Sequence, residues 1–224
     1  MSLSRWERWA PATGVVFVVL FIIAFFLGGQ PPKPNDPIAK ITTFIVDHRR
    51  KLQATAYLGG IGTIFFFWFL GSFRDVLAKA EGGTGRLTSI LFSSGVIIVG
   101  IATLSLGMLA TMAFKPAITG DGGVRVLFDL GNMSFAMVQF PMVAFLLAAS
   151  ILMIRTGAIS RRLGWLGLLN AVIQLIVAGA LFPDHGALAA GGAFNTAGFF
   201  LFFLWMLAAS IIMTAQAGTA APAS

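Results

Sequence analysis

The chain's 224 residues are 58% hydrophobic and only 10% charged, with a mean hydropathy of +0.91, whereas soluble domains carry about 25% charged residues, so an ordinary soluble domain is excluded. The net charge of +7 comes from fifteen Lys and Arg residues scattered over several short segments, which is not the clustered pattern of a nucleic-acid-binding surface. Because the chain has no cysteine, disulfides, Cys-ligated metals and a thiol nucleophile are excluded as well.

Six apolar stretches follow one another along the chain, each near or above the roughly 20 residues that a helix needs to cross a bilayer. Backbone amides in lipid must be satisfied within their own segment, and strand-like alternation is absent, so the stretches are predicted to be helices. The predicted fold is all-α: a polytopic transmembrane helical bundle of about six spans, with an interfacial amphipathic helix before span two. The predicted spans are residues 12–29, 54–73, 87–114, 127–154, 163–182 and 193–213. They form a single transmembrane domain, residues 1–216, followed by a tail, 217–224, that is expected to be disordered.

The first span is predicted to be retained rather than cleaved. Arg5 and Arg8, placed before an apolar run, have the outline of a secretory signal peptide. No small-x-small cleavage site follows, and Trp6 and Trp9 occupy the place of an interfacial aromatic belt. We therefore expect an uncleaved transmembrane helix.

The next helix is predicted to begin at Asp36-Pro37, with Asp36 as N-cap and proline at the first helical position. From Ile38 onward, apolar residues recur at spacings of three, four and seven, while the charged residues lie mostly on other faces. This pattern indicates an interfacial amphipathic helix that runs into span two.

Span three carries a stripe of small residues at helical spacing. Its members are Ser89, Ser93, Gly100, Thr103, Gly107 and Thr111. Such a face lets two helices approach closely in lipid, where the hydrophobic effect does not drive helix association. The stripe predicts either packing within the bundle or self-association between copies of the chain.

Spans four to six contain five amide side chains, and Pro141 predicts a kink in span four. The amides are Asn132, Gln139, Asn170, Gln174 and Asn195. Asn132 and Gln139 are two turns apart on one helix face, and Asn170 and Gln174 are one turn apart. Counted from the span ends, Gln139 and Gln174 both come near mid-bilayer, while Asn195 lies nearer the outer side. The five amides are therefore candidates for one polar layer.

Two interpretations of this layer stay open. As a ligand site, the amides would fix the polar end of a neutral or lipophilic ligand in an outward-facing cavity. As structural groups, they would hydrogen-bond one helix to another, because an unsatisfied amide in lipid is costly whatever the protein does.

Two Asp-His pairs contain both histidines of the chain and are predicted to lie on the outer side: Asp47-His48 and Asp184-His185. Histidine with a carboxylate is able to bind zinc or act as an acid/base pair. However, adjacent helical residues point about 100° apart, and histidines separated by more than 130 residues have no metal-ligand spacing. The alternative is that Asp47 is a solvated partner of Arg50 or Lys51 and that the second pair is a polar turn.

The orientation is predicted from the Lys and Arg count, because positive residues near span ends stay in the cytoplasm. With both termini inside, eight of the fifteen lie on the cytoplasmic side and seven on the outer side. The short basic loop around Arg161 and Arg162 favours this orientation over its inverse.

Two parts of the chain resemble a group of uncharacterised multi-pass membrane proteins of actinobacteria. The resemblance is carried by IAKITTFIVDHRRKLQATAYLGGIGTIFFFWFLGSFRDVLAKAEGGTGRL, and by ISRRLGWLGLLNAV with LFFLWMLAAS. It implies a protein of the bacterial inner membrane and transfers no catalytic residue. Its most recognisable segments, HRR-x-L and AEGG-x-GRL, lie at the two ends of span two, which suggests that those ends matter.

These features favour a non-enzymatic membrane protein without a cofactor or metal, which binds a lipophilic ligand or serves as an accessory subunit of another membrane protein. No span has an ionisable residue deep inside it, which weighs against ion-coupled transport. A permease that uses the amide layer and an outer-surface enzyme that uses the Asp-His pairs remain as alternatives. Membrane lipid is expected to surround the spans.

Overall fold

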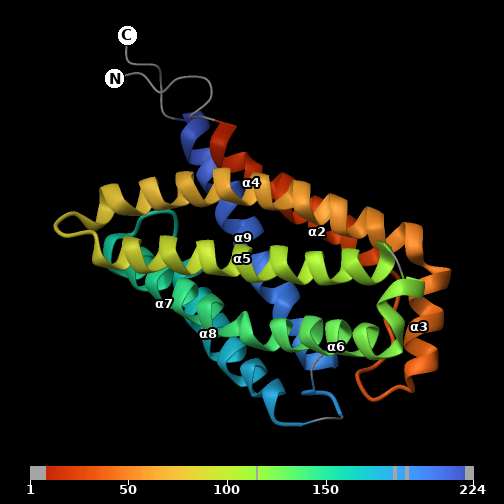
Figure 1. Cartoon of the computed structure of the whole chain (residues 1–224). Coiled ribbons are helices and arrows are strands. Elements are labelled where there is room, and N and C mark those ends of the chain that lie inside the picture. The colour runs from red at the N-terminus through yellow and green to blue at the C-terminus, as the bar shows by residue number, and fades with distance from the viewer. Residues whose placement is uncertain (1–8, 115, 184–185, 190–191, 220–224) are drawn as a thin grey trace.

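The computed structural model describes residues 9–114, 116–183, 186–189 and 192–219, and within these ranges every regular element is a helix (Figure 1). The α-helices are α2 (Thr13–Leu27), α3 (Ile38–Asp47), α4 (Arg49–Glu81), α5 (Arg86–Phe114), α6 (Pro116–Met137), α7 (Gln139–Thr156), α8 (Arg161–Val177) and α9 (Ala193–Thr219). Two short 3-10 helices are η1 (Ala10–Ala12) and η2 (Ala178–Leu181).

Six helical segments are long and apolar enough to cross a membrane, which confirms the predicted fold class. They are Ala10–Leu27, Arg49–Glu81, Arg86–Phe114, Thr119–Thr156, Arg161–Leu181 and Ala193–Gly218. The chain thus has the fold of a multi-pass helical membrane protein. The second segment is longer than the predicted 54–73 at both ends, and α9 continues to Thr219, past the predicted start of the tail.

The fourth segment consists of two helices, because α6 and α7 are separated at Val138. Pro141 has no N–H to donate to the carbonyl of Met137, four residues earlier, so the helix is weakened at this point. The irregularity that Pro141 predicts is therefore present, three residues before the proline. A second departure from helical geometry lies at Gly120, where φ is +64°.

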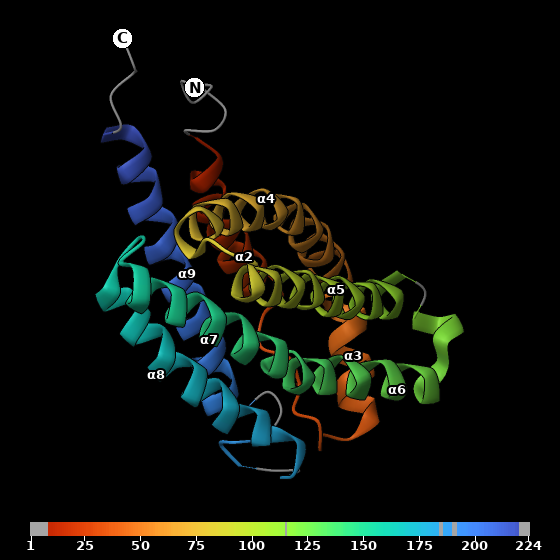
Figure 2. The ribbon, with the colours of Figure 1, turned by 90° about the vertical axis from the view of Figure 1, so that its left-hand side faces the viewer.

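The spanning helices pack in a closed ring of neighbours. α2 packs on α4, α4 on α5, α5 on α7, α7 on α8, α8 on α9, and α9 returns to α2 (Figure 2). At the closure, the Ser210 hydroxyl on α9 donates to the carbonyl of Pro11 at 2.6 Å. The start of the first span and the last part of the sixth therefore lie at the same end of the bundle.

Aromatic rings fill the centre of this ring of helices. The Phe73 ring on α4 lies 5.7 Å from that of Phe145 on α7 and 6.1 Å from that of Trp205 on α9. Phe145 is also 5.8 Å from Phe202, and all of these side chains are buried. Aromatic pairs at such distances add to the packing energy of their buried area. Close packing and dispersion between these buried rings stabilise the centre of the bundle.

The amphipathic helix α3 covers a second, smaller core at the other end of the molecule. Its buried Ile41 and Ile45 pack with Met112, Val124 and Phe128 of α5 and α6. The helix begins at Ile38 with Pro37 as N-cap, one residue later than predicted, and it stops at His48 instead of running into α4. Asp36 instead accepts hydrogen bonds from Lys40 and from the Lys33 amide, and the bond from Lys40 is the main cause of a lowered Asp36 pKa.

Candidate functional site

The two amides of α8 hydrogen-bond to α9. Gln174 Nε2 donates to Asn170 Oδ1 at 2.9 Å and to the carbonyl of Gly198 at 2.7 Å. Asn170 Nδ2 donates to the carbonyl of Leu201 at 3.1 Å. Both side chains are buried. This pair therefore has the interhelical role that the structural interpretation of the layer predicts.

The two amides of span four hydrogen-bond within their own segment. Asn132 Nδ2 donates to the carbonyl of Phe128 at 2.9 Å, and Gln139 Nε2 to that of Phe135 at 3.1 Å. Asn132 is half-buried, whereas Gln139 is fully buried. Val138, which separates α6 from α7, lies between the two side chains.

Helix register brings Gln139, Gln174 and Asn195 to nearly one depth. A Cβ at Gly167 on α8 would collide with Ser150 Oγ on α7, so these residues face each other. Because α7 and α8 are antiparallel, the residue eleven positions before Ser150 lies opposite the residue eleven positions after Gly167, which places Gln139 opposite Ala178. Eleven residues are about three helical turns, so Gln139 lies on the same face of α7 as Ser150, the face toward α8. On the next pair, Gln174 is bonded to Gly198, which sets Asn195 opposite Val177. All three amides thus lie within about one helical turn, roughly 5.4 Å, along the bundle.

Three side-chain atoms of this layer are buried without a hydrogen-bond partner among the described residues: Gln139 Oε1, Gln174 Oε1 and Asn195 Nδ2. Leaving such atoms unpaired costs about 1–3 kcal/mol each. A fourth buried atom without a partner, Ser150 Oγ, lies about three turns away along α7 from Gln139. We call Gln139, Gln174 and Asn195 the amide layer from here on.

Of the two Asp-His pairs, the structure describes Asp47-His48. His48 lies at the junction of α3 and α4, where Nδ1 is hydrogen-bonded to the carbonyl of Phe44 at 3.0 Å and the ring stacks on that of Phe44. Asp47 is exposed, and it belongs to none of the three ion pairs between described residues. Asp184 and His185 lie outside the described residues. No group of three His, Asp or Glu side chains suitable for a metal is found among the described ones.

The small-residue stripe of α5 faces away from the bundle. All six of its residues, Ser89, Ser93, Gly100, Thr103, Gly107 and Thr111, are exposed. A Cβ added at Gly100 or Gly107 would meet no atom within 4 Å. By contrast, the bundle's packed glycines have no such room: at Gly95 of the same helix a Cβ would lie 2.6 Å from Leu70 Cδ1.

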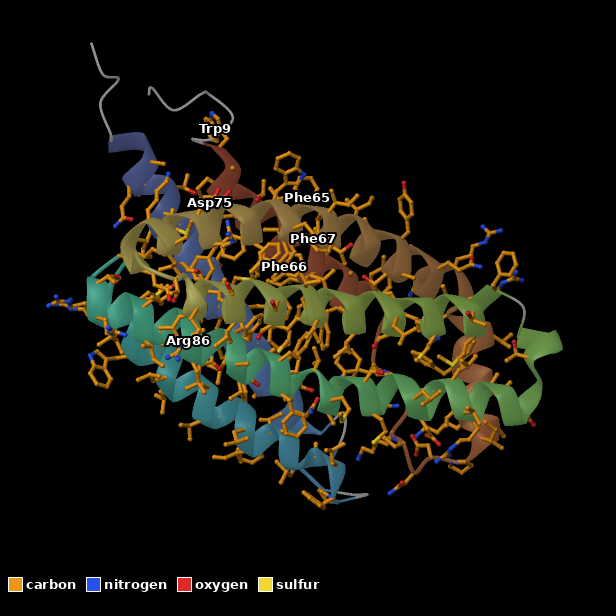
Figure 3. The ribbon with its side chains drawn as sticks, turned by 60° about the vertical axis from the view of Figure 1, so that its left-hand side comes forward. Trp9, Phe65, Phe66, Phe67, Asp75 and Arg86 are labelled. Carbon is orange, nitrogen blue, oxygen red and sulfur yellow. The ribbon has the colours of Figure 1, made fainter. Side chains whose placement is uncertain are left out.

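The stripe continues onto α4, a relationship that the sequence did not reveal. A shallow hollow between the two helices is lined by Gly71, Arg74, Asp75, Ser89, Phe92 and Ser93. Arg74 and Asp75 form an exposed ion pair of 3.1 Å there, and Asp75 lies on the same side of the molecule as Trp9 (Figure 3). Periodicity within one helix cannot show which faces of two helices adjoin. We call the exposed small residues of α5 with Gly71, Arg74 and Asp75 the α4–α5 face.

The chemistry available inside the bundle is hydrogen bonding between neutral groups. Among the described residues, the buried polar side chains are amides and hydroxyls: Thr88, Ser94, Gln139, Ser150, Asn170, Gln174, Asn195 and Ser210. Comparison of the chain with protein-family models, with curated proteins and with solved structures finds no match. The site residues are therefore interpreted from their geometry alone.

Proposed function

We propose that the protein is a non-enzymatic membrane subunit that acts by binding another membrane protein through the α4–α5 face. The observation that carries the proposal is the pair of open glycines, Gly100 and Gly107, in the middle of an exposed transmembrane helix. Glycine inside a helix costs roughly 0.5–1 kcal/mol relative to alanine. On a surface that only lipid touches, nothing offsets that cost, whereas a partner helix gains close backbone contact from it.

The polar groups of the face suit a helix partner. The Ser89 hydroxyl donates to the carbonyl of Gly85, just before α5, and the Thr111 hydroxyl to that of Gly107 within α5, at 2.8 Å each, so neither hydroxyl needs a hydrogen bond from a partner. The only charges of the face, Arg74 and Asp75, lie close to one end of α4. A partner that packs along α5 therefore meets small uncharged residues and reaches the ion pair only near that end.

A photo-crosslinker tests the proposal in native membranes. We expect p-benzoylphenylalanine at Leu104, beside the stripe, to form a covalent adduct with one defined protein, because Leu104 would flank the bound helix. The matched control is the same crosslinker at Ile176 on α8, since both side chains are outward-facing, 60% and 58% exposed. The adduct is identified by mass spectrometry, and a band of twice the monomer mass would mean self-association.

A second variant makes this test specific. Gly100→Leu with Gly107→Leu fills the stripe, and because a Cβ at either position would meet no atom within 4 Å, the bundle is expected to fold normally while the Leu104 adduct is lost. Equal adducts at positions 104 and 176, or an adduct that survives the leucine substitutions, would contradict the proposal.

We also propose the bacterial cytoplasmic membrane as the location, with both termini in the cytoplasm. The resemblance to actinobacterial membrane proteins supports the first part, and the Lys and Arg count supports the second. Because the natural chain has no cysteine, Lys33→Cys and Lys79→Cys are each a unique label site. In intact cells we expect a membrane-impermeant maleimide to label Lys33→Cys and to label Lys79→Cys only after lysis; the reverse pattern would invert the orientation.

A further inference from the structure

We infer that the amide layer binds one neutral hydroxyl group, carried either by a water molecule that bridges Gln139 Oε1, Gln174 Oε1 and Asn195 Nδ2, or by a lipophilic alcohol that bridges Gln139 Oε1 and Asn195 Nδ2. The inference concerns a different part of the molecule from the α4–α5 face and does not depend on the proposed function. It rests on three buried polar atoms from three different helices, in side chains that are 0%, 0% and 4% exposed.

The hydrogen-bonding character of these atoms defines the ligand class. The two glutamine oxygens only accept hydrogen bonds, and the asparagine nitrogen only donates. A water molecule supplies two donors for the oxygens and an acceptor for the nitrogen. An alcohol hydroxyl supplies one donor and an acceptor, which satisfies the nitrogen and one of the oxygens. A bound ion is disfavoured, because the buried polar side chains of the described bundle contain no charge to balance it.

The three unpaired atoms lie at neighbouring levels of the bundle. Gln139 and Asn195 face the same end of α8, and their free oxygen and nitrogen are complementary, yet they are not hydrogen-bonded to each other. Gly198 of α9 lies beside the third atom, since a Cβ added at Gly198 would be only 3.2 Å from Gln174 Oε1. A hydroxyl between the helices satisfies atoms that the helices do not satisfy between themselves.

A double-mutant cycle tests the inference on the purified, full-length protein. The variants are Gln139→Met, Asn195→Leu and their combination, with thermal unfolding as the readout. If one hydroxyl bridges both residues, each single variant lowers the unfolding temperature, and the double variant lowers it by clearly less than the sum. If the atoms are truly unpaired, the effects of the two single substitutions add, which would overturn the inference.

A direct bond between the two amides would also couple them, so an X-ray structure that resolves ordered water is the second measurement. We expect density for one oxygen within hydrogen-bond distance of Gln139 Oε1 and Asn195 Nδ2. A direct bond between these atoms, with no such density, would refute the inference. Asn132→Leu is the control, because Asn132 is half-buried and outside the layer, and its cycle with Asn195 should be additive. If Asn195→Leu does not fold, Asn195→Ser replaces it.

The source of the hydroxyl is settled by adding 1-hexadecanol, with hexadecane as the matched probe that lacks a hydroxyl. An alcohol site predicts that 1-hexadecanol raises the unfolding temperature of the natural protein by several degrees, and that the Gln139→Met and Asn195→Leu double variant shows no such rise. A water site predicts that neither probe has an effect although the coupling and the density are present. Equal stabilisation by both probes would mean unspecific binding of the chain and would exclude the alcohol as the source.

Discussion

Gly167→Ala is expected to destabilise the protein by about 1–3 kcal/mol, the usual cost of overpacking a well-packed interior. The new methyl group would collide with Ser150 Oγ on α7 and would lie 2.8 Å from Trp205 Nε1 on α9. The indole cannot move away freely, because its Nε1 donates to the carbonyl of Leu163 at 2.9 Å. Three helices therefore meet at a position that has room only for a hydrogen atom.

The matched control is Gly100→Ala on α5. A Cβ there would meet no atom within 4 Å, so the purified protein in detergent should gain roughly 0.5–1 kcal/mol from the better helix propensity of alanine. Both variants are measured by thermal unfolding at equal detergent concentration. Opposite signs are the expected result. Equal effects at positions 167 and 100 would contradict the assignment of one glycine to the interior and the other to the exterior.

A second substitution in the same background tests the cause. Ser150 Oγ is buried without a hydrogen-bond partner among the described residues, so Ser150→Ala alone should cost little. In combination with Gly167→Ala it removes one of the colliding atoms and should restore part of the lost stability. The contact with Trp205 remains, so restoration is expected to be incomplete.

The number and class of the spans could be predicted from sequence because the bilayer imposes a simple rule: about 20 apolar residues in an unbroken helix. The ends of the helices follow a different rule. α4 extends from Arg49 to Glu81, well beyond the predicted 54–73, because charged helix formers continue a helix beyond its apolar part. Hydropathy identifies the apolar part of a helix but does not show at which residue the backbone hydrogen bonds of the helix end.

The arrangement of the side chains could be predicted only within single helices. The spacing of Asn170 and Gln174 correctly indicates that they can interact, and their bond of 2.9 Å follows from it. The partner helix does not follow, since the α9 carbonyls that they reach lie far along the chain. The α5 stripe was equally ambiguous, because small residues in lipid serve both a packed interior and a docking surface.

The two ends of α4 have a shared structural role. Arg49, in HRR-x-L, donates from Nε to the carbonyl of Ala113 at 2.9 Å and from Nη2 to that of Phe114 at 2.7 Å. Glu81, in AEGG-x-GRL, accepts from the amides of Leu87 and Thr88 at 2.8 and 2.9 Å, and from the Thr88 hydroxyl at 2.8 Å. The ends of α4 thus hold the two opposite ends of α5.

Each of these contacts supplies the charge that its helix end favours. The C-terminus of α5 carries unpaired carbonyls and partial negative charge, which a guanidinium satisfies, and its N-terminus carries unpaired amides, which a carboxylate satisfies. The loop between the helices allows the second contact because Gly82, Gly83 and Gly85 all have φ near +60°, a conformation that other residues avoid. Together the contacts fix the register of α5 against α4, and with it the α4–α5 face.

Removing either contact is therefore expected to destabilise the α4–α5 pair: Glu81→Ala by about 2 kcal/mol and Arg49→Ala by about 1–2 kcal/mol. The two sites lie at opposite ends of a helix roughly 40 Å long, so the double variant should show the sum of the single effects. Arg50→Ala and Lys79→Ala are the controls, since both side chains are exposed near the same helix ends. Thermal unfolding gives the free-energy changes, and limited proteolysis of the Gly82–Gly83 loop should accelerate only when Glu81 is replaced.

If the face depends on this register, Glu81→Ala also weakens the Leu104 crosslink, whereas an unchanged crosslink in a destabilised protein would show that partner binding itself holds α5 in place.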